Sequence, residues 1–128
     1  LALTAGGAAW SWGNGAFGQL GHGDDQDQLL PKKIEALALV GQRVVAVSSG
    51  DRHSIARTAD GALFAWGHGE CGCLGHGEDL SNQLLPKKVE ALAGQRVVAV
   101  SAGSGQSLAI TADGAVWSWG EGTYGKLG

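Results

Sequence analysis

The chain has 128 residues, of which 44% are hydrophobic, and its formal net charge is −3. This length suits one compact domain, and the 23 glycines favour tightly turned strands over helices. The acidic balance gives no basic field for a phosphate backbone, so we expect no direct nucleic-acid partner. The apolar runs are far shorter than the ~20 residues that cross a bilayer, and no leader opens the chain, so we expect a soluble protein without a membrane partner.

The two cysteines, Cys71 and Cys73, are too close together for an ordinary structural disulfide and too few for a secreted disulfide framework. This favours a reducing compartment, and we predict a cytoplasmic or nuclear location. The sequence has no methionine, and Leu1 reads as the middle of a strand. We therefore expect the chain to be a segment of a longer protein.

One pattern of residues occurs three times along the chain. The segment from Leu1 to Gly23 returns from Ile55 to Gly77 and again from Leu108 to Gly128, at offsets of 54 and 53 residues. A unit of about 50 residues is typical of propeller blades rather than helical solenoids. The sequence therefore predicts a single all-β propeller fragment over 1–128. Its repeat units are about 1–54, 55–107 and, in part, 108–128.

Each unit predicts four short strands. Val44–Ser48 is small or apolar on both faces, as expected of an innermost strand, and Ile55–Thr58 follows it. The pair Asp60-Gly61 then predicts a two-residue hairpin turn into a third strand rich in tryptophan. A fourth strand around Lys32–Glu35, and again at Lys87–Glu90, begins just after a proline. Because proline lacks the N–H that a central strand donates, we place this strand on the outer edge.

Aromatic residues in the third strands form the predicted core. Two rings fall two positions apart in each unit, so they share one face of the strand. Burying one ring removes ~150–250 Å² from water, or about 4–6 kcal/mol gross at ~25 cal/mol/Å². The six core residues are Trp10, Trp12, Phe64, Trp66, Trp117 and Trp119.

These features together resemble the regulator-of-chromosome-condensation repeat. The motif is an Asp-Gly turn, a Trp-Gly strand end, a Leu-Gly-His-Gly loop, a proline, a valine-rich strand and Gly-x-x-His-Ser. The resemblance covers the whole chain. The repeats of this chain are similar to those found in giant HECT-type ubiquitin ligases. It implies a seven-bladed ring, of which this chain supplies about two and a half four-stranded blades. Open blade edges predict instability, self-association or completion by further sequence.

A zinc site is an alternative reading of one loop. His68, Cys71, Cys73 and His76 offer four nitrogen and sulfur ligands. The other repeats do not keep this set. The slot of His68 holds Asn14 and Glu121, that of Cys71 holds Phe17 and Tyr124, and that of Cys73 holds Gln19 and Lys126. We therefore predict no metal and no cofactor.

Histidine catalysis is not expected either. Gln106 replaces His53 at the same slot, and glutamine is no general base near neutral pH. No nucleophile elbow or phosphate-binding glycine loop is present in the sequence. We therefore predict that the chain is not an enzyme.

The remaining interpretation is a protein-interaction module that binds a protein partner. Alternating strand directions bring the short loops and the long glycine-rich loops to one face, and the candidate contacts lie there. Loop solvation explains these residues equally well. They are Asp51, Arg52 and Ser104 in the short loops and Asp24, Asp25, Glu78 and Asp79 in the long ones.

Two alternatives follow from the resemblance. One is a guanine-nucleotide exchange factor for a small GTPase, although no position here matches an exchange loop residue by residue. The other is the substrate-recruiting region of a ubiquitin ligase. Light-sensing members of the family carry tryptophans in the loop before the second strand, whereas the loops 49–53 and 102–106 have none.

Overall fold

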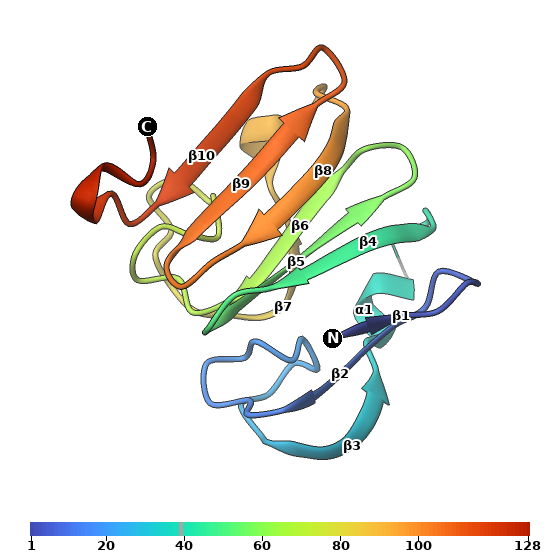
Figure 1. The fold of residues 1–128 in the computed structure, drawn as a ribbon. Helices are drawn as coiled ribbons and strands as arrows, with labels where there is room; N and C mark the ends of the chain where they lie inside the picture. Colours follow the sequence, from blue (N-terminus) through green and yellow to red (C-terminus); the bar gives the residue numbers. More distant parts are fainter. Residues whose placement is uncertain (39) are drawn as a thin grey trace.

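Strands dominate the computed structural model, which describes residues 1–38 and 40–128. They form three antiparallel sheets that lie side by side like the blades of a fan (Figure 1). We call these sheets blade 1 (β1–β3), blade 2 (β4–β7) and blade 3 (β8–β10). The described helices have three or four residues each, too short to span a bilayer.

Blade 2 is a complete four-stranded blade with the order β4-β5-β6-β7. Its inner strand comes from one sequence repeat and its other strands come mainly from the next, so the sheet joins two repeats. The bounds are β4 Val44–Ser49, β5 His53–Thr58, β6 Leu63–Gly67 and β7 Gln83–Lys88, followed by the 3₁₀ helix η1 Glu90–Leu92.

Blades 1 and 3 have three strands each. Blade 1 contains a second, third and outer strand, whereas blade 3 contains an inner, second and third strand. The strands of the three blades thus amount to two and a half four-stranded blades, which confirms the predicted fold class. The bounds are β1 Ala2–Leu3, β2 Ala9–Gly13, β3 Gln28–Lys33, α1 Glu35–Ala38, β8 Val97–Ala102, β9 Gln106–Thr111, β10 Val116–Gly120 and the 3₁₀ helix η2 Thr123–Gly125.

The turn between β5 and β6 differs from the predicted two-residue hairpin. The Thr58 amide donates to the Ala62 carbonyl, 3.0 Å away, so three residues lie between the paired positions. Gly61 has a φ of +88°, which suits the left-handed position at the end of a three-residue loop. The Asp60 carboxylate accepts hydrogen bonds from the Thr58 hydroxyl and the Ala62 amide. These side-chain bonds to Asp60 favour the longer loop.

The outer strands begin earlier than predicted. They run over Gln28–Lys33 and Gln83–Lys88, so each proline lies inside its strand, and Glu35 and Glu90 belong to the following helices. The register between β6 and β7 shifts between Ala65 and Gly67, opposite the segment that holds the proline. This irregularity in an edge pairing accommodates a residue without an N–H.

The hydrophobic core lies between the blades. Consecutive residues Ile55 and Ala56 are both 0% exposed, and they belong to different clusters because neighbouring side chains point to opposite faces of a strand. Blade 2 is therefore covered on both faces. The cluster between blades 1 and 2 contains Ala9, Ile34, Leu37, Val44, Ala56 and Trp66. The cluster between blades 2 and 3 contains Ile55, Leu63, Ala65, Cys73, Leu74, Val89, Leu92, Val97 and Ala109.

The six predicted core rings have unequal environments. Trp66 is 0% exposed, and Trp119 packs against the cluster between blades 2 and 3. Trp10 and Phe64 are half-buried. Trp12 and Trp117 are 43% and 41% exposed, so the prediction that they are buried is wrong for this chain. Trp12 faces away from blade 2 with no blade over it, and Trp117 lies on β10, the edge strand of blade 3.

Candidate functional site

The short loops and the loops after the tryptophan strands meet at one end of the blades. The His68 amide donates to the Arg52 carbonyl and the Glu121 amide donates to the Gly105 carbonyl, each at 2.9 Å. The Asp-Gly turns lie at the opposite end, where the Val97 amide donates to the Gly61 carbonyl. We call the first end, made by loops 14–19, 50–52, 68–72 and 103–105, the loop end.

Two of the predicted contact residues touch each other across the boundary between blades 2 and 3. The Ser104 hydroxyl donates to the Asp51 carboxylate at 2.9 Å, and the Asp51 amide donates to the Gly103 carbonyl at 3.3 Å. Both side chains are exposed. The two short loops thus form one continuous surface.

A third predicted residue, Arg52, lies over an aromatic ring from blade 1. Its guanidinium carbon is 5.2 Å from the centroid of Phe17, and the Phe17 ring meets the His68 ring edge-on at 4.7 Å. A cation over an aromatic face at an exposed site is worth ~0.5–1 kcal/mol. Sequence reasoning did not select Phe17; its slot in the repeat holds Cys71 and Tyr124, so two of three repeats have an aromatic ring there.

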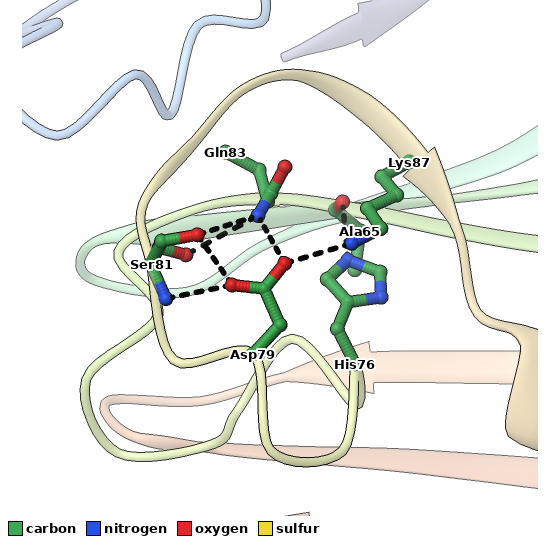
Figure 2. A network of polar contacts seen from close by, with 6 residues as sticks. All are labelled: Ala65, His76, Asp79, Ser81, Gln83 and Lys87. Atoms are coloured by element: carbon green, nitrogen blue, oxygen red, sulfur yellow. Dashed lines mark hydrogen bonds and ion pairs between the residues drawn. The ribbon is translucent and has the colours of Figure 1, made fainter.

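The acidic residues of the long loops lie elsewhere, beside the outer strand of blade 2. Figure 2 shows the Asp79 carboxylate accepting from the Ser81 amide and hydroxyl, from Gln83 at 3.2 Å and from Lys87 of β7 at 2.9 Å. The Ser81 hydroxyl, followed by Lys87, holds the pKa of Asp79 well below its usual range. Because the Asp79 carboxylate is occupied by these hydrogen bonds, it stabilises the conformation of its own loop.

The loop of blade 1 reaches the same strand. The Gly23 amide donates to the Leu84 carbonyl of β7 at 2.9 Å, which brings the following Asp24 and Asp25 beside blade 2. The Asp24 carboxylate accepts a hydrogen bond from the backbone N–H of Gln26, and the Asp25 carboxylate accepts one from the Gln26 side chain. Glu78 is exposed. The seven candidate residues therefore do not form one site.

The side chains of the four residues considered for zinc do not converge on one point. The Cys73 thiol donates to the His68 carbonyl at 3.3 Å, and the Cys71 thiol lies 3.6 Å from the Gly105 carbonyl. Burial, and then the Cys71 thiol, raise the pKa of Cys73 to about 12. The His76 ring donates to the Ala65 carbonyl (Figure 2). Within residues 1–38 and 40–128, no three His, Cys, Asp or Glu residues are placed to share a metal ion.

A buried histidine connects the loop end to the blade interface. The Ser107 hydroxyl donates to the Cys73 carbonyl at 2.7 Å and therefore accepts from His53 Nε2, 2.9 Å away. Burial lowers the pKa of His53 below 6.5. This chain of hydrogen bonds holds blade 3 against blade 2 just beneath Asp51 and Arg52.

Repeated antiparallel blades of three or four strands, with cores between them and loops gathered at one end, define a β-propeller segment. The family model for the regulator of chromosome condensation (RCC1) repeat matches residues 6–57 and 60–110, and a second RCC1 repeat model matches 44–73 and 97–126. The chain belongs to the RCC1 repeat family, which confirms the resemblance seen in the sequence.

Two curated relatives show how small a part of a protein the chain represents. Human E3 ubiquitin-protein ligase HERC2 is 50% identical over 130 residues, which cover 100% of this chain and 3% of HERC2. The ultraviolet-B receptor UVR8 of Arabidopsis thaliana is 42% identical over 119 residues, which cover 93% of this chain and 26% of UVR8.

Solved structures share the same arrangement of blades. Human WBSCR16 has a TM-score of 0.83 at 30% identity, over 92% of this chain and 29% of WBSCR16. Prp20p of Saccharomyces cerevisiae has a TM-score of 0.78 at 25% identity, over 92% of this chain and 30% of Prp20p, and its structure was described together with its binding to Gsp1p and histones.

Proposed function

We propose that the chain is a non-catalytic protein-binding module whose partner contacts the loop end around Arg52. The observation that carries this proposal is the joining of loops from all three blades into one surface. Phe17, Arg52 and Ser104 come from consecutive blades. The Phe17 ring lies under the Arg52 guanidinium, and Ser104 donates a hydrogen bond to Asp51, the neighbour of Arg52. A surface held in place before binding loses less conformational entropy when a partner arrives.

The residue types suit a protein partner. Arginine and aromatic residues are enriched among the residues that dominate binding energy at interfaces. Arg52 is exposed and still has donors for a partner's carboxylate or backbone carbonyl groups, while Phe17 supports its guanidinium from below. The described binding of Prp20p to Gsp1p and histones supports a protein partner for a relative with this fold.

Affinity capture with the whole chain as bait, read by quantitative mass spectrometry, tests the proposal. We expect Arg52→Ala and Phe17→Ala to lower capture of the specific partner at least tenfold, which corresponds to about 1.4 kcal/mol. The matched control is Arg96→Ala, because Arg96 lies against Gly61 at the opposite end of the blades. Capture that is indifferent to Arg52 and Phe17, or no specific capture, would refute the loop end as the binding surface.

Guanine-nucleotide exchange is a second candidate, favoured by the structural likeness to Prp20p and the Gsp1p binding described for that protein. In this case the partner is a small GTPase. A nucleotide-release assay with a panel of small GTPases separates exchange from simple binding. Release rates that do not change with added chain would exclude exchange.

Substrate recruitment for a ubiquitin ligase is a third candidate, favoured by the 50% identity to HERC2. Here the captured partner is ubiquitinated by a protein that contains this segment. The test compares ubiquitination of the partner by the parent protein with and without Arg52→Ala. If Arg52→Ala leaves ubiquitination of the partner unchanged, the loop end does not recruit substrates for the ligase.

A further inference from the structure

The two cysteines of the chain lie together at the interface between blades 2 and 3, and both are free thiols. Between them is Gly72, whose φ of +73° turns the chain back on itself. The Cys73 side chain belongs to the hydrophobic cluster between these blades, and the Cys71 side chain packs against it. The two thiols lie within hydrogen-bonding reach of each other. A reaction that joins the two sulfur atoms therefore needs no large movement of the chain.

Packing between the blades does not require these cysteines. The other repeats hold Phe17 and Tyr124 in the slot of Cys71, and Gln19 and Lys126 in the slot of Cys73. What the slot of Cys73 contributes to the next blade is its backbone carbonyl, which accepts from Trp119 Nε1 at 2.9 Å. The Gln19 carbonyl accepts from Trp66 Nε1 at the same distance of 2.9 Å. Because a backbone contact tolerates many side chains, the pair of thiols is open to another role.

The two thiols differ in their access to solvent. Cys71 is half-buried, whereas Cys73 is 2% exposed and burial raises the pKa of its thiol to about 12. A dissolved oxidant therefore reaches Cys71 first, since oxidation follows thiolate character and exposure. Cys73 is shielded from the oxidant but not from the sulfur of Cys71. This is the arrangement of a reactive thiol beside a thiol that resolves its oxidised form.

We propose that Cys71 and Cys73 form a reversible oxidation site for a small hydroperoxide such as hydrogen peroxide. The Cys71 thiolate attacks one peroxide oxygen and the O–O bond breaks. The leaving oxygen takes up the proton that Cys71 released and becomes water, and Cys71 becomes a sulfenic acid. The Cys73 sulfur then attacks the Cys71 sulfur, so that an S–S bond forms and the S–OH bond breaks. The hydroxyl group leaves with the Cys73 proton as a second water. The peroxide is thus reduced while the two thiols are oxidised to a disulfide.

A disulfide across a single residue is strained, and strained disulfides are readily reduced. The bond therefore forms under oxidation and is lost when a thiol reductant returns. This agrees with the expectation from the sequence that Cys71 and Cys73 are too close together for an ordinary structural disulfide.

Oxidation should loosen the contact between two loops of neighbouring blades. In the reduced chain the Cys71 thiol lies 3.6 Å from the Gly105 carbonyl of blade 3, and the Cys73 thiol donates to the His68 carbonyl at 3.3 Å. The disulfide has no thiol proton, so both carbonyls lose these donors. It also draws the Cys71 sulfur towards Cys73 and away from loop 103–105. The test of this proposal needs no partner, so it stands or falls separately from the proposed function.

Mass spectrometry of the whole chain after peroxide treatment tests the chemistry. We expect the wild-type chain to lose two hydrogens, to gain no oxygen, and to return to its first mass with dithiothreitol. The sequence has no methionine, so added oxygen reports chiefly on cysteine. Cys73→Ser should stop at a sulfenic acid that dimedone captures. Cys71→Phe, which has the residue of the first repeat, should consume its remaining thiol at least tenfold more slowly than wild type.

Hydrogen exchange read by mass spectrometry tests the effect on the fold. We expect the amides of loop 103–105 to exchange at least threefold faster after oxidation, while blade 1, which has no cysteine, serves as the internal reference. The matched control is Cys71→Phe combined with Cys73→Gln, the residues of the first repeat, whose exchange should not respond to peroxide. Circular dichroism checks that each variant keeps its strands.

Four results would overturn the proposal. The peroxide-treated chain could keep both thiols or only gain oxygen, or its disulfide could join two chains. Cys73→Ser could give no dimedone adduct, which would exclude the sulfenic acid. Exchange in loop 103–105 could also stay unchanged after the disulfide has formed, which would show that oxidation does not alter the contact between the blades.

Discussion

Truncating Trp66 to alanine should destabilise the chain far more than truncating Trp12, although both residues hold the same slot of the repeat. Trp66 is 0% exposed and Trp12 is 43% exposed. For a ring of ~200 Å², this difference amounts to about 90 Å², or about 2 kcal/mol at ~25 cal/mol/Å². Trp66→Ala also leaves a cavity between blades 1 and 2, and we expect a total loss of ~3–5 kcal/mol in the free energy of unfolding.

Urea denaturation followed by circular dichroism measures both losses, at a protein concentration where the chain is monomeric. A third variant, Trp66→Phe, removes the indole N–H, which donates to the Gln19 carbonyl at 2.9 Å, but keeps an aromatic ring between the blades. We expect Trp66→Phe to cost less than Trp66→Ala, with ~1 kcal/mol of its loss coming from the missing indole hydrogen bond. If Trp12→Ala and Trp66→Ala lowered stability equally, the location of the core between blades would be refuted.

Three further changes have defined outcomes. Gly61→Ala should lower the free energy of unfolding, measured by urea denaturation, by ~1–3 kcal/mol more than Gly114→Ala. Both glycines have a positive φ, so the backbone strain of the two variants is alike. They differ because an added Cβ at Gly61 would lie 2.7 Å from a side-chain carbon of Arg96, whereas one at Gly114 would meet nothing within 4 Å. Burial lowers the pKa of His53 below 6.5, so the unfolded chain takes up the proton first and the free energy of unfolding falls as pH drops below 6.5. His53→Gln should reduce this dependence of stability on pH, measured by denaturation at a series of pH values. Native alkylation followed by peptide mass spectrometry should label Cys71 before Cys73, because Cys73 is 2% exposed and burial raises the pKa of its thiol to about 12.

The order of strands within a blade could be predicted from the sequence because each strand has a local signal. Valine-rich segments, the Asp-Gly pair and alternating tryptophans mark the inner, second and third strands. The outer strand has no such signal at its start, since Gln28–Leu30 could equally belong to the long loop. Proline suggested a boundary, but the strand passes through it because the pairing with the third strand is irregular there.

Exposure of the tryptophans could not be predicted in the same way. Trp12 and Trp66 are equivalent in sequence, and their environments differ because only Trp66 has a blade over its face. The repeat shows which residues are alike but not which of them have a neighbour. Contacts between blades join residues about one repeat apart, as with Ser104 and Asp51, which are separated by 53 positions.

The candidate binding surface was partly predictable for the same reason. Strand direction alone brings Asp51, Arg52 and Ser104 to one end, but the placement of Phe17 beneath Arg52 requires the packing of blade 1 on blade 2. Asp79 was selected from its charge, whereas its hydrogen bonds to Ser81 and Lys87 hold its own loop together. Charge in a long loop does not distinguish these two roles.

Blade packing and partner binding should be coupled through His53. Its bond to Ser107 lies beneath the contact between Asp51 and Ser104, so the two halves of the loop end are aligned only while blade 3 is docked on blade 2. A partner that contacts both Arg52 and Ser104 binds this docked state and not an undocked one. It must therefore raise the unfolding midpoint, and the stabilisation should grow with the logarithm of the partner's concentration once that concentration exceeds the dissociation constant. A partner confined to one loop would bind the docked and the undocked state equally and would leave the equilibrium between them unchanged.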